Sequence, residues 1–137
     1  MRADALTEAE VLATLDSFND ALAQKDIEGA LAVLTPDVVL MGSEAGELAK
    51  GLDEVRRLLE HLFSQPVSFR WTWKWREVSA AGPVAWVIAE ATFGGTHPYR
   101  MTVVLEKRAG RWLWTQFHGS EPAPPYPTGG SATGNSP

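Results

Sequence analysis

The first part of the chain has apolar residues at helical spacing. Between residues 7 and 26 they recur every third or fourth position, while most acidic side chains fall on the other side. Thr7 is followed three residues later by Glu10, which is the pattern of a capping box at a helix start. The apolar stripe consists of Val11, Leu15, Phe18 and Leu22. We therefore predict an amphipathic helix over residues 7–26.

Two shorter helices follow in the predicted order of elements. One covers residues 26–34 and is ended by Pro36, because proline lacks the backbone N–H that a helix interior needs. The other covers residues 52–63, whose apolar side chains also gather on one side. Between these helices we predict a short strand over residues 37–43 and a loop over residues 43–51.

The second half of the chain favours strands. Four apolar stretches are separated by short turns that each contain glycine, and such turns join neighbouring antiparallel strands. The stretches are residues 67–78, 84–93, 99–108 and 111–118. Helices followed by an antiparallel sheet indicate an α+β fold. The helices would cover one face of a strongly curved sheet and leave a cavity between the two layers.

Alternation along the strands assigns residues to the two faces of this sheet. If the turns close simple hairpins, Ala91 lies opposite Met101, and Met101 lies opposite His118. The face that carries these three residues is apolar except at one end, where Gln116, His118 and the Tyr99 hydroxyl come together. We expect this face to lie under the helices. Apolar walls with a few convergent polar groups are typical of a small-molecule site.

His118 is the candidate catalytic residue, because imidazole titrates near neutral pH and can move a proton. The alternative is structural, with His118 closing the strand by bonding to the Ser120 segment or to the first helix. The candidate ligand-binding residues are Tyr99, Met101, Gln116, Trp114, Phe93 and Trp73. Ordinary core packing is the alternative for Tyr99, Met101, Gln116 and Trp114, and it is favoured for Met101 and Trp114.

The orientation of the first long strand is open. Trp71, Trp73 and Trp75 alternate with basic and polar residues, and basic side chains are disfavoured beneath helices. A bulge near residues 79–83 would turn the tryptophans inward and give the pocket an aromatic wall. Without a bulge they join Trp86 on the mixed outer face, as an apolar patch that an oligomer would hide.

Composition excludes several classes of protein. The formal net charge is −5 and there is no run of basic residues, so we expect no nucleic-acid partner. The absence of cysteine excludes disulfides, thiolate metal sites and a cysteine nucleophile. The three histidines, at positions 61, 97 and 118, lack metal-ligand spacing, and we expect neither a metal nor a cofactor.

The distribution of apolar and small residues bears on organisation and location. No apolar run approaches the length of a membrane span, and the first residues lack the apolar core of a signal peptide. We therefore expect a cytoplasmic protein that does not associate with membranes. A single domain is predicted over residues 1–122. Residues 123–137 are rich in Pro, Gly and Ser, which predicts a flexible tail.

One stretch carries a family resemblance. In "GRWLWTQFHGSEP", Gly110, Trp112, His118, Ser120 and Pro122 match a G-x-W strand that ends in H-x-S-x-P, and "GPVAWV" supports the match. Over residues 8–122 the chain resembles SnoaL-like proteins of the nuclear-transport-factor-2-like superfamily. It is similar in particular to the branch that includes the association domain of calcium/calmodulin-dependent kinase. The resemblance implies a conical, cystatin-like α+β barrel, a homodimer formed through the sheet, and a pocket between sheet and helices.

The resemblance does not imply one reaction, since the superfamily contains cyclases, isomerases and dehydratases as well as non-catalytic binders. No carboxylate falls on the expected pocket face, and Glu90 has the opposite parity. The arginines of the kinase association domain are replaced here by Ala91 and Val103. Two functions stay open. One is a site for an apolar ligand, with isomerisation, cyclisation or dehydration of a ring or polyketide-like carbonyl compound as the reaction if there is one. The other is a non-catalytic homodimeric binding or assembly module with a vestigial pocket.

Overall fold

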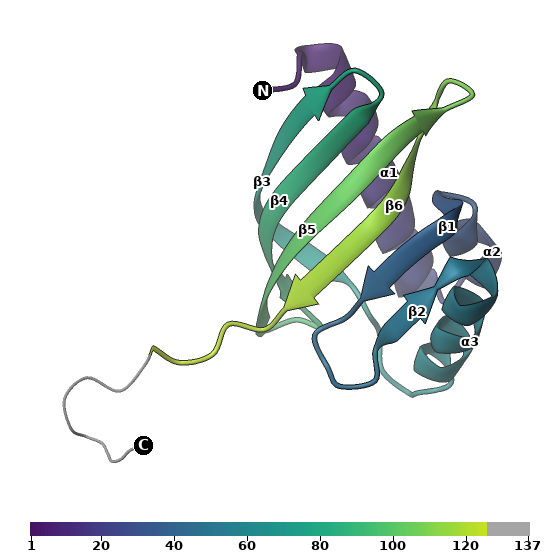
Figure 1. The fold of residues 1–137 in the computed structure, drawn as a ribbon. Helices are drawn as coiled ribbons and strands as arrows, with labels where there is room; N and C mark the ends of the chain where they lie inside the picture. The colour runs from purple at the N-terminus through teal and green to yellow at the C-terminus, as the bar shows by residue number, and fades with distance from the viewer. Residues whose placement is uncertain (126–137) are drawn as a thin grey trace.

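The computed structural model describes residues 1–125, and its elements follow the predicted α+β order (Figure 1). Within these residues the helices are α1 (Ala5–Gln24), α2 (Ile27–Leu31) and α3 (Gly51–Phe63). The strands are β1 (Leu34–Met41), β2 (Leu48–Lys50), β3 (Trp71–Ala81), β4 (Val84–Phe93), β5 (His97–Arg108) and β6 (Arg111–Ser120). The predicted tail over residues 123–137 lies almost wholly outside the described residues.

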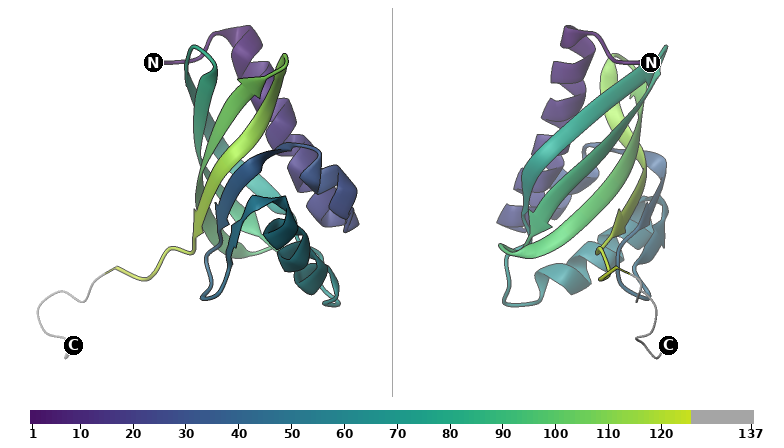
Figure 2. Two further views of the ribbon diagram at one scale, coloured as in Figure 1. Left: turned by 45° about the vertical axis from the view of Figure 1, so that its right-hand side comes forward. Right: turned by 90° about the vertical axis from the view of Figure 1, so that its left-hand side faces the viewer.

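All strands belong to one sheet in the order β2-β1-β6-β5-β4-β3. Neighbouring strands are antiparallel, except that β1 and β6 run parallel. Figure 2 shows β3, β4 and β5 as long curved strands with α1 lying across one face, and α2 and α3 beside β1 and β2. The predicted meander is therefore confirmed as the larger part of the sheet, with β1 added along its free edge.

Helix boundaries differ from the predictions at both ends of α1. Asp4 is the N-cap, and its carboxylate accepts a hydrogen bond from the Thr7 backbone N–H at 2.8 Å. The Thr7–Glu10 pattern therefore lies inside the helix and does not start it. The helix ends at Gln24, and the next residue, Lys25, is the C-cap and adopts a left-handed backbone conformation with φ 55°.

The region between α2 and α3 contains more strand than predicted. Pro36 lies within β1, because α2 already ends at Leu31 and the chain becomes extended three residues later. Residues 48–50, predicted as loop, form β2. So short a strand has no alternation to recognise, and its pairing with β1 is what defines it.

The predicted hairpin registers are wrong by two residues between β4 and β5 and are also wrong between β5 and β6. Ala91 pairs with Tyr99, and Met101 pairs with Gly119. A shift of two residues preserves the faces, so the inward assignment of β4 and β5 holds. The faces of β3 and β6 depend on bulges, which are described below.

The core lies between α1 and the inner face of the sheet, which is the face that α1 covers. Val11, Leu15 and Phe18 of α1 are buried against this face, and Val55 and Leu59 attach α3 to the layer. The apolar stripe predicted for the first helix is therefore confirmed as its buried side. Within residues 1–125, no helix combines the length and apolar character that spanning a membrane requires.

Candidate functional site

A bulge in β3 divides the three tryptophans of this strand between the two faces. Trp73 pairs with Ala91, whereas Trp75 pairs with Glu90, so Lys74 is an extra residue between them. Trp71 and Trp73 therefore face α1, and Trp75 is 44% exposed on the outer face. Each predicted orientation is right for part of the set, and the bulge lies in the middle of the strand instead of near residues 79–83.

Trp71 is the centre of a group of aromatic rings on the inner side of the sheet. Its ring centroid lies 5.4 Å from that of Phe93 and 5.9 Å from those of Trp73 and Tyr99. At the other side of the group, Trp114 stacks on Phe18 of α1 at 4.3 Å. We call this group the aromatic cluster: Phe18, Trp71, Trp73, Phe93, Tyr99, Trp114 and Phe117.

The cluster is graded in exposure. Trp71 and Trp114 are 5% and 1% exposed, whereas Trp73 and Phe93 are half-buried. Phe69, just before β3, is half-buried, and its ring centroid lies 5.7 Å from that of Phe93. It extends the aromatic surface toward solvent. The rings therefore lead from the surface at the Phe69–Phe93 end toward the buried indole of Trp71.

Two indole N–H groups of the cluster have no hydrogen-bond acceptor among the described residues. They are Nε1 of Trp71 and Nε1 of Trp114, and both atoms are buried. By contrast, Trp75 Nε1 donates to Glu90 at 2.8 Å and Trp112 Nε1 donates to Glu10 at 3.3 Å. A buried donor without an acceptor costs about 1–3 kcal/mol relative to a satisfied one.

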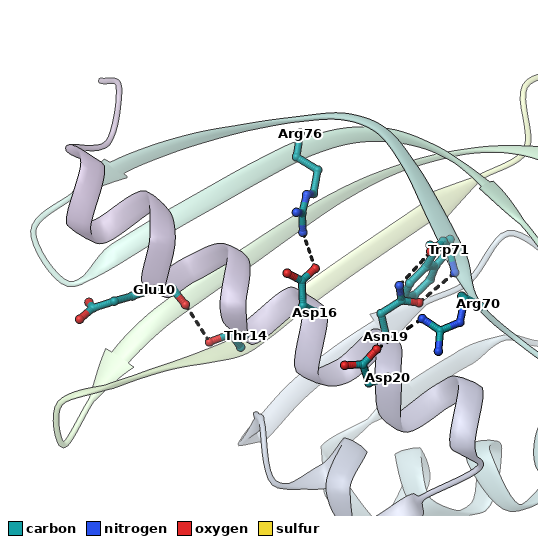
Figure 3. Close-up of polar contacts among 8 residues, drawn as sticks. All are labelled: Glu10, Thr14, Asp16, Asn19, Asp20, Arg70, Trp71 and Arg76. Carbon is teal, nitrogen blue, oxygen red and sulfur yellow. Dashed lines mark hydrogen bonds and ion pairs between the residues drawn. The ribbon is translucent and has the colours of Figure 1, made fainter.

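Asn19 of α1 fixes the backbone of Trp71 (Figure 3). Its side-chain Nδ2 donates to the Trp71 carbonyl at 2.8 Å, and its Oδ1 accepts from the Trp71 N–H at 2.9 Å. Asn19 is buried, although it lies outside the apolar stripe predicted for this helix. The available signal was the residue type, because asparagine is unfavourable inside a helix unless its amide finds partners.

Two ion pairs flank this contact and join α1 to β3 and to the segment that precedes it (Figure 3). Asp16 lies 2.7 Å from Arg76, and Asp20 lies 3.4 Å from Arg70. The Arg76 side chain is only 18% exposed, and its guanidinium carbon lies 4.8 Å from the centre of the Trp73 ring. Arg76 is therefore an exception to the expectation that basic side chains are disfavoured beneath helices, because Asp16 compensates its charge.

Tyr99 closes the inner face near the end of β6. Its side chain occupies the space that a Cβ at position 119 would need, so glycine is required there. The pKa of Tyr99 is raised to about 12, mainly by burial; a hydrogen bond with Ser43 opposes this shift, and the carboxylates of Glu47, Glu121 and Glu44 add smaller contributions to it. The Tyr99 hydroxyl therefore keeps its proton at neutral pH.

The predicted faces of Gln116 and His118 are wrong. Thr115 is an extra residue in β6, since Trp114 pairs with Leu105 while Gln116 pairs with Val104. Phe117 therefore faces inward and is buried, whereas Gln116 and His118 are exposed on the outer face. Their suggested roles in ligand binding and proton transfer stay predictions, and the geometry gives them no part in a site under the helices.

The other predicted ligand-binding residues lie on the inner face. Tyr99, Met101 and Trp114 are buried, and Phe93 and Trp73 are half-buried. The inner face thus brings together five of the six residues named for ligand binding. It does so without Gln116.

A separate hollow lies between α1 and the start of β6. It has a volume of about 330 Å³ and is an open groove beside the β5–β6 turn. Its walls include Glu10, Thr14 and Ser17 of α1 and Arg111 and Trp112 of β6. None of these residues belongs to the aromatic cluster, so this groove is distinct from that cluster.

The histidines are dispersed. His61 lies on α3, His97 begins β5 and His118 lies near the end of β6. Within residues 1–125, no group of three or more His, Asp or Glu side chains comes together in a way that could hold a metal ion.

Comparison with known proteins places this architecture in a large structural group. A protein of unknown function from Pseudomonas putida KT2440, described as NTF2-like (nuclear transport factor 2-like), superposes with a TM-score of 0.78 at 20% identity over 87% of this chain and 89% of its own. A proposed dehydratase of the NTF2-like family from Streptomyces avermitilis gives 0.79 at 17% identity, over 89% and 100% of the two chains. A proposed calcium/calmodulin-dependent protein kinase II association domain from Xanthomonas campestris gives 0.72 at 25% identity, over 82% and 86%.

No curated protein matches the chain by sequence. The family model for the SnoaL-like domain, however, matches residues 11–124, which include most of α1 and all the strands of the sheet. The likeness to solved NTF2-like and cystatin-like structures agrees with that match in fold. The chain is therefore a member of the SnoaL-like family and has the NTF2-like α+β fold.

Proposed function

We propose that this protein binds a small, mostly apolar molecule between its helices and its sheet. The observation that carries the proposal is the aromatic cluster on the inner face, which is graded from the half-buried Phe93 and Trp73 to the buried Trp71. Aromatic rings contribute large apolar areas with few rotatable bonds, so they bind flat ring compounds at small entropic cost.

The proposal covers binding and includes no chemical step. Isomerisation, cyclisation or dehydration of a carbonyl compound needs a general base near the ligand. Among the described residues, no Asp or Glu of β3 to β6 faces inward, and Glu90 is held on the outer face by Trp75 and Arg100. The Tyr99 hydroxyl, with a pKa of about 12, stays protonated at neutral pH and is therefore a poor general base.

The test compares two tryptophans of one strand that lie on opposite faces. Ring carbonyl compounds and polyketide fragments are screened by ligand-detected NMR against wild type, Trp73→Leu and Trp75→Leu. We expect Trp73→Leu to weaken saturable binding at least about fivefold, because about 1 kcal/mol of aromatic contact is lost. Trp75→Leu, on the outer face, leaves binding unchanged.

Equal effects of the two substitutions would contradict the proposal, as would the absence of saturable binding in wild type. Because Trp73 is only half-buried, both variants are expected to fold, and their melting temperatures provide the check.

A second candidate function, compatible with the first, is assembly of a homodimer through the outer face of the sheet. One row of this face runs across neighbouring strands from Ile88 through Thr102, His118 and Met41 to Leu48. Ile88 is 52% exposed, and Met41 and Leu48 are also exposed. Figure 2, in its right-hand view, shows no helix over the near face of β3 to β5. Exposed apolar side chains in one row are typical of a surface that a partner covers.

The dimer is tested by light scattering after size exclusion, with Ile88→Glu and Val67→Glu as a matched pair. Both residues are about half exposed, but Val67 lies outside the sheet. We expect a wild-type dimer, a monomeric Ile88→Glu variant and a dimeric Val67→Glu variant. A wild-type monomer at micromolar concentration would contradict the assembly, as would a dimer that Ile88→Glu leaves intact.

A further inference from the structure

We infer that the indole N–H groups of Trp71 and Trp114 are the polar recognition elements of the inner face, and that the ligand is a neutral ring compound with a hydrogen-bond acceptor. The acceptor is a carbonyl, an ether or a ring nitrogen. This inference rests on the proposed small-molecule function and specifies the chemistry of that same site.

The first support is the selective lack of partners at these two atoms. Trp71 Nε1 and Trp114 Nε1 are buried without an acceptor among the described residues, whereas Trp75 and Trp112 donate to carboxylates. Buried donors are almost always satisfied, since leaving one unpaired is costly. Two such donors within one cluster indicate that an acceptor belongs beside them.

The second support is that both rings are held in place before any ligand arrives. The Trp71 backbone is held by both ends of the Asn19 amide. The Trp114 ring stacks with the rings of Phe18 and Phe117, with centroid distances of 4.3 and 5.7 Å. The planes of Trp71 and Trp114 differ by 26°, with their centroids 6.5 Å apart. Donors that are already ordered lose little entropy when an acceptor binds.

The third support concerns the charge of the ligand. Burial is the main cause of the raised pKa of Tyr99, but the carboxylates of Glu47, Glu121 and Glu44 also raise it, so three negative charges act on this end of the cluster. The inward cation at Arg76 is already paired with Asp16. Within residues 1–125, a carboxylate ligand on the inner face would therefore meet repulsion without an unpaired inward cation to offset it, whereas a neutral acceptor would not.

The test uses three probes of similar size: 1-tetralone, which carries a carbonyl; tetralin, which lacks it; and 1-naphthoate, which is an anion. We expect 1-tetralone to bind about tenfold more tightly than tetralin, as one well-placed hydrogen bond would produce, and 1-naphthoate to bind more weakly than 1-tetralone. The indole N–H signals of the six tryptophans are followed in ¹⁵N-labelled wild-type protein. Those of Trp71 and Trp114 should move with 1-tetralone, while those of Trp75 and Trp112 should not.

A matched pair of variants isolates the N–H group. Trp114→Phe keeps an aromatic ring but removes the donor, and it should lower the preference for 1-tetralone over tetralin by at least threefold. Trp112→Phe removes an indole N–H that is already bonded to Glu10, and it should leave the preference unchanged. Because Trp114 is a core residue, the spectra of the wild type provide a readout that does not depend on how this variant folds.

The possible results separate the two levels of the proposal. Equal binding of 1-tetralone and tetralin would overturn the inference while the proposed apolar site stands. The inference would also be overturned if the indole N–H signals of Trp71 and Trp114 lie upfield in the free protein and do not shift when 1-tetralone is added. Neighbouring ring faces would then be the acceptors of these N–H groups. If neither neutral probe binds and the wider carbonyl screen is also negative, the proposed function fails and the inference fails with it.

Discussion

Asn19 does for β3 what a neighbouring strand would do. β3 is the last strand of the sheet, and residues 1–3 pair only with its far end at Ser79, so the free side of its backbone has no strand partner at Trp71. An asparagine amide presents one donor and one acceptor, which matches the N–H and C=O of a single strand residue. Asn19 uses both on Trp71 and so connects α1 to the centre of the aromatic cluster.

Replacing this amide is expected to be costly. Asn19→Ala leaves the buried N–H and C=O of Trp71 unpaired and should lower the free energy of unfolding by about 2–4 kcal/mol. Ser17→Ala, at an exposed position of the same helix, should change it by less than about 0.5 kcal/mol. Urea denaturation measures both values. Similar values for the two variants would show that the Asn19 contact contributes nothing.

Tyr99 gives the protein a measurable response to alkaline pH. Its pKa is about 12 in the folded protein, against about 10 for an unfolded tyrosine. The raised value means that the folded state favours the protonated form, and this stabilisation is complete below pH 10. It is lost as pH rises through 12, because the unfolded chain then releases the proton first.

The corresponding experiment compares wild type with Tyr99→Phe, which has no proton to lose at this position. Between pH 8 and pH 11 the free energy of unfolding of wild type should fall by about 1.4 kcal/mol more than that of the variant. Urea denaturation at the two pH values measures the difference. Parallel changes in the two proteins would mean that the pKa of Tyr99 is not raised.

At the scale of elements, single extra residues in strands decide which side chains meet. Lys74 separates Trp73 from Trp75 in β3, and Thr115 separates Trp114 from Gln116 in β6. Thr115 also shares a hydrogen bond of 3.3 Å with Thr35, which lies where the register of β1 shifts. Each bulge exchanges the faces of every residue that follows it in the strand.

The role of Lys74 can be tested by deletion. Removing Lys74 leaves Trp73 inward and Trp75 outward in regular alternation, so the fold should survive with a change in unfolding free energy of about 1 kcal/mol or less. Deleting Thr72 instead breaks the alternation between Trp71 and Trp73 and should cost more than about 3 kcal/mol. Near-UV circular dichroism and urea denaturation distinguish the two. A Lys74 deletion as damaging as the Thr72 deletion would contradict this account.

The bulges also explain how far the sequence could be interpreted. The inward faces of β4 and β5 were predictable, because an error of two residues in a turn preserves alternation. The faces of Gln116 and His118 were not, since nothing in the residues around Thr115 distinguishes a bulged position from a regular one. Two other features could not be predicted: the hydrogen bonds of Asn19 to Trp71, and the lack of an acceptor for the Trp71 indole N–H. Both depend on how close different elements lie to each other in the folded chain.

At the scale of the whole molecule, one sheet has two faces with different chemistry. The inner face carries the aromatic cluster under α1, and the outer face carries the exposed row from Ile88 to Leu48. The family match and the superpositions account for the shared fold, while the proposed ligand chemistry depends on side chains of this chain. His118 lies in the outer row, so its position fits the proposed subunit contact better than the proposed ligand site.

The parallel pairing of β1 with β6 has a consequence for folding during translation. Thr35 and Thr115, which bond where the two strands meet, are 80 residues apart. β1 can pair with β2 early, but nearly the whole domain must be translated before its parallel partner β6 exists, and contacts between distant residues slow folding. The β3–β4–β5 meander can pair as it leaves the ribosome, so the nascent chain holds part of the sheet before β6 is made. The last strand, β6, then pairs with β5 on one side and with β1 on the other.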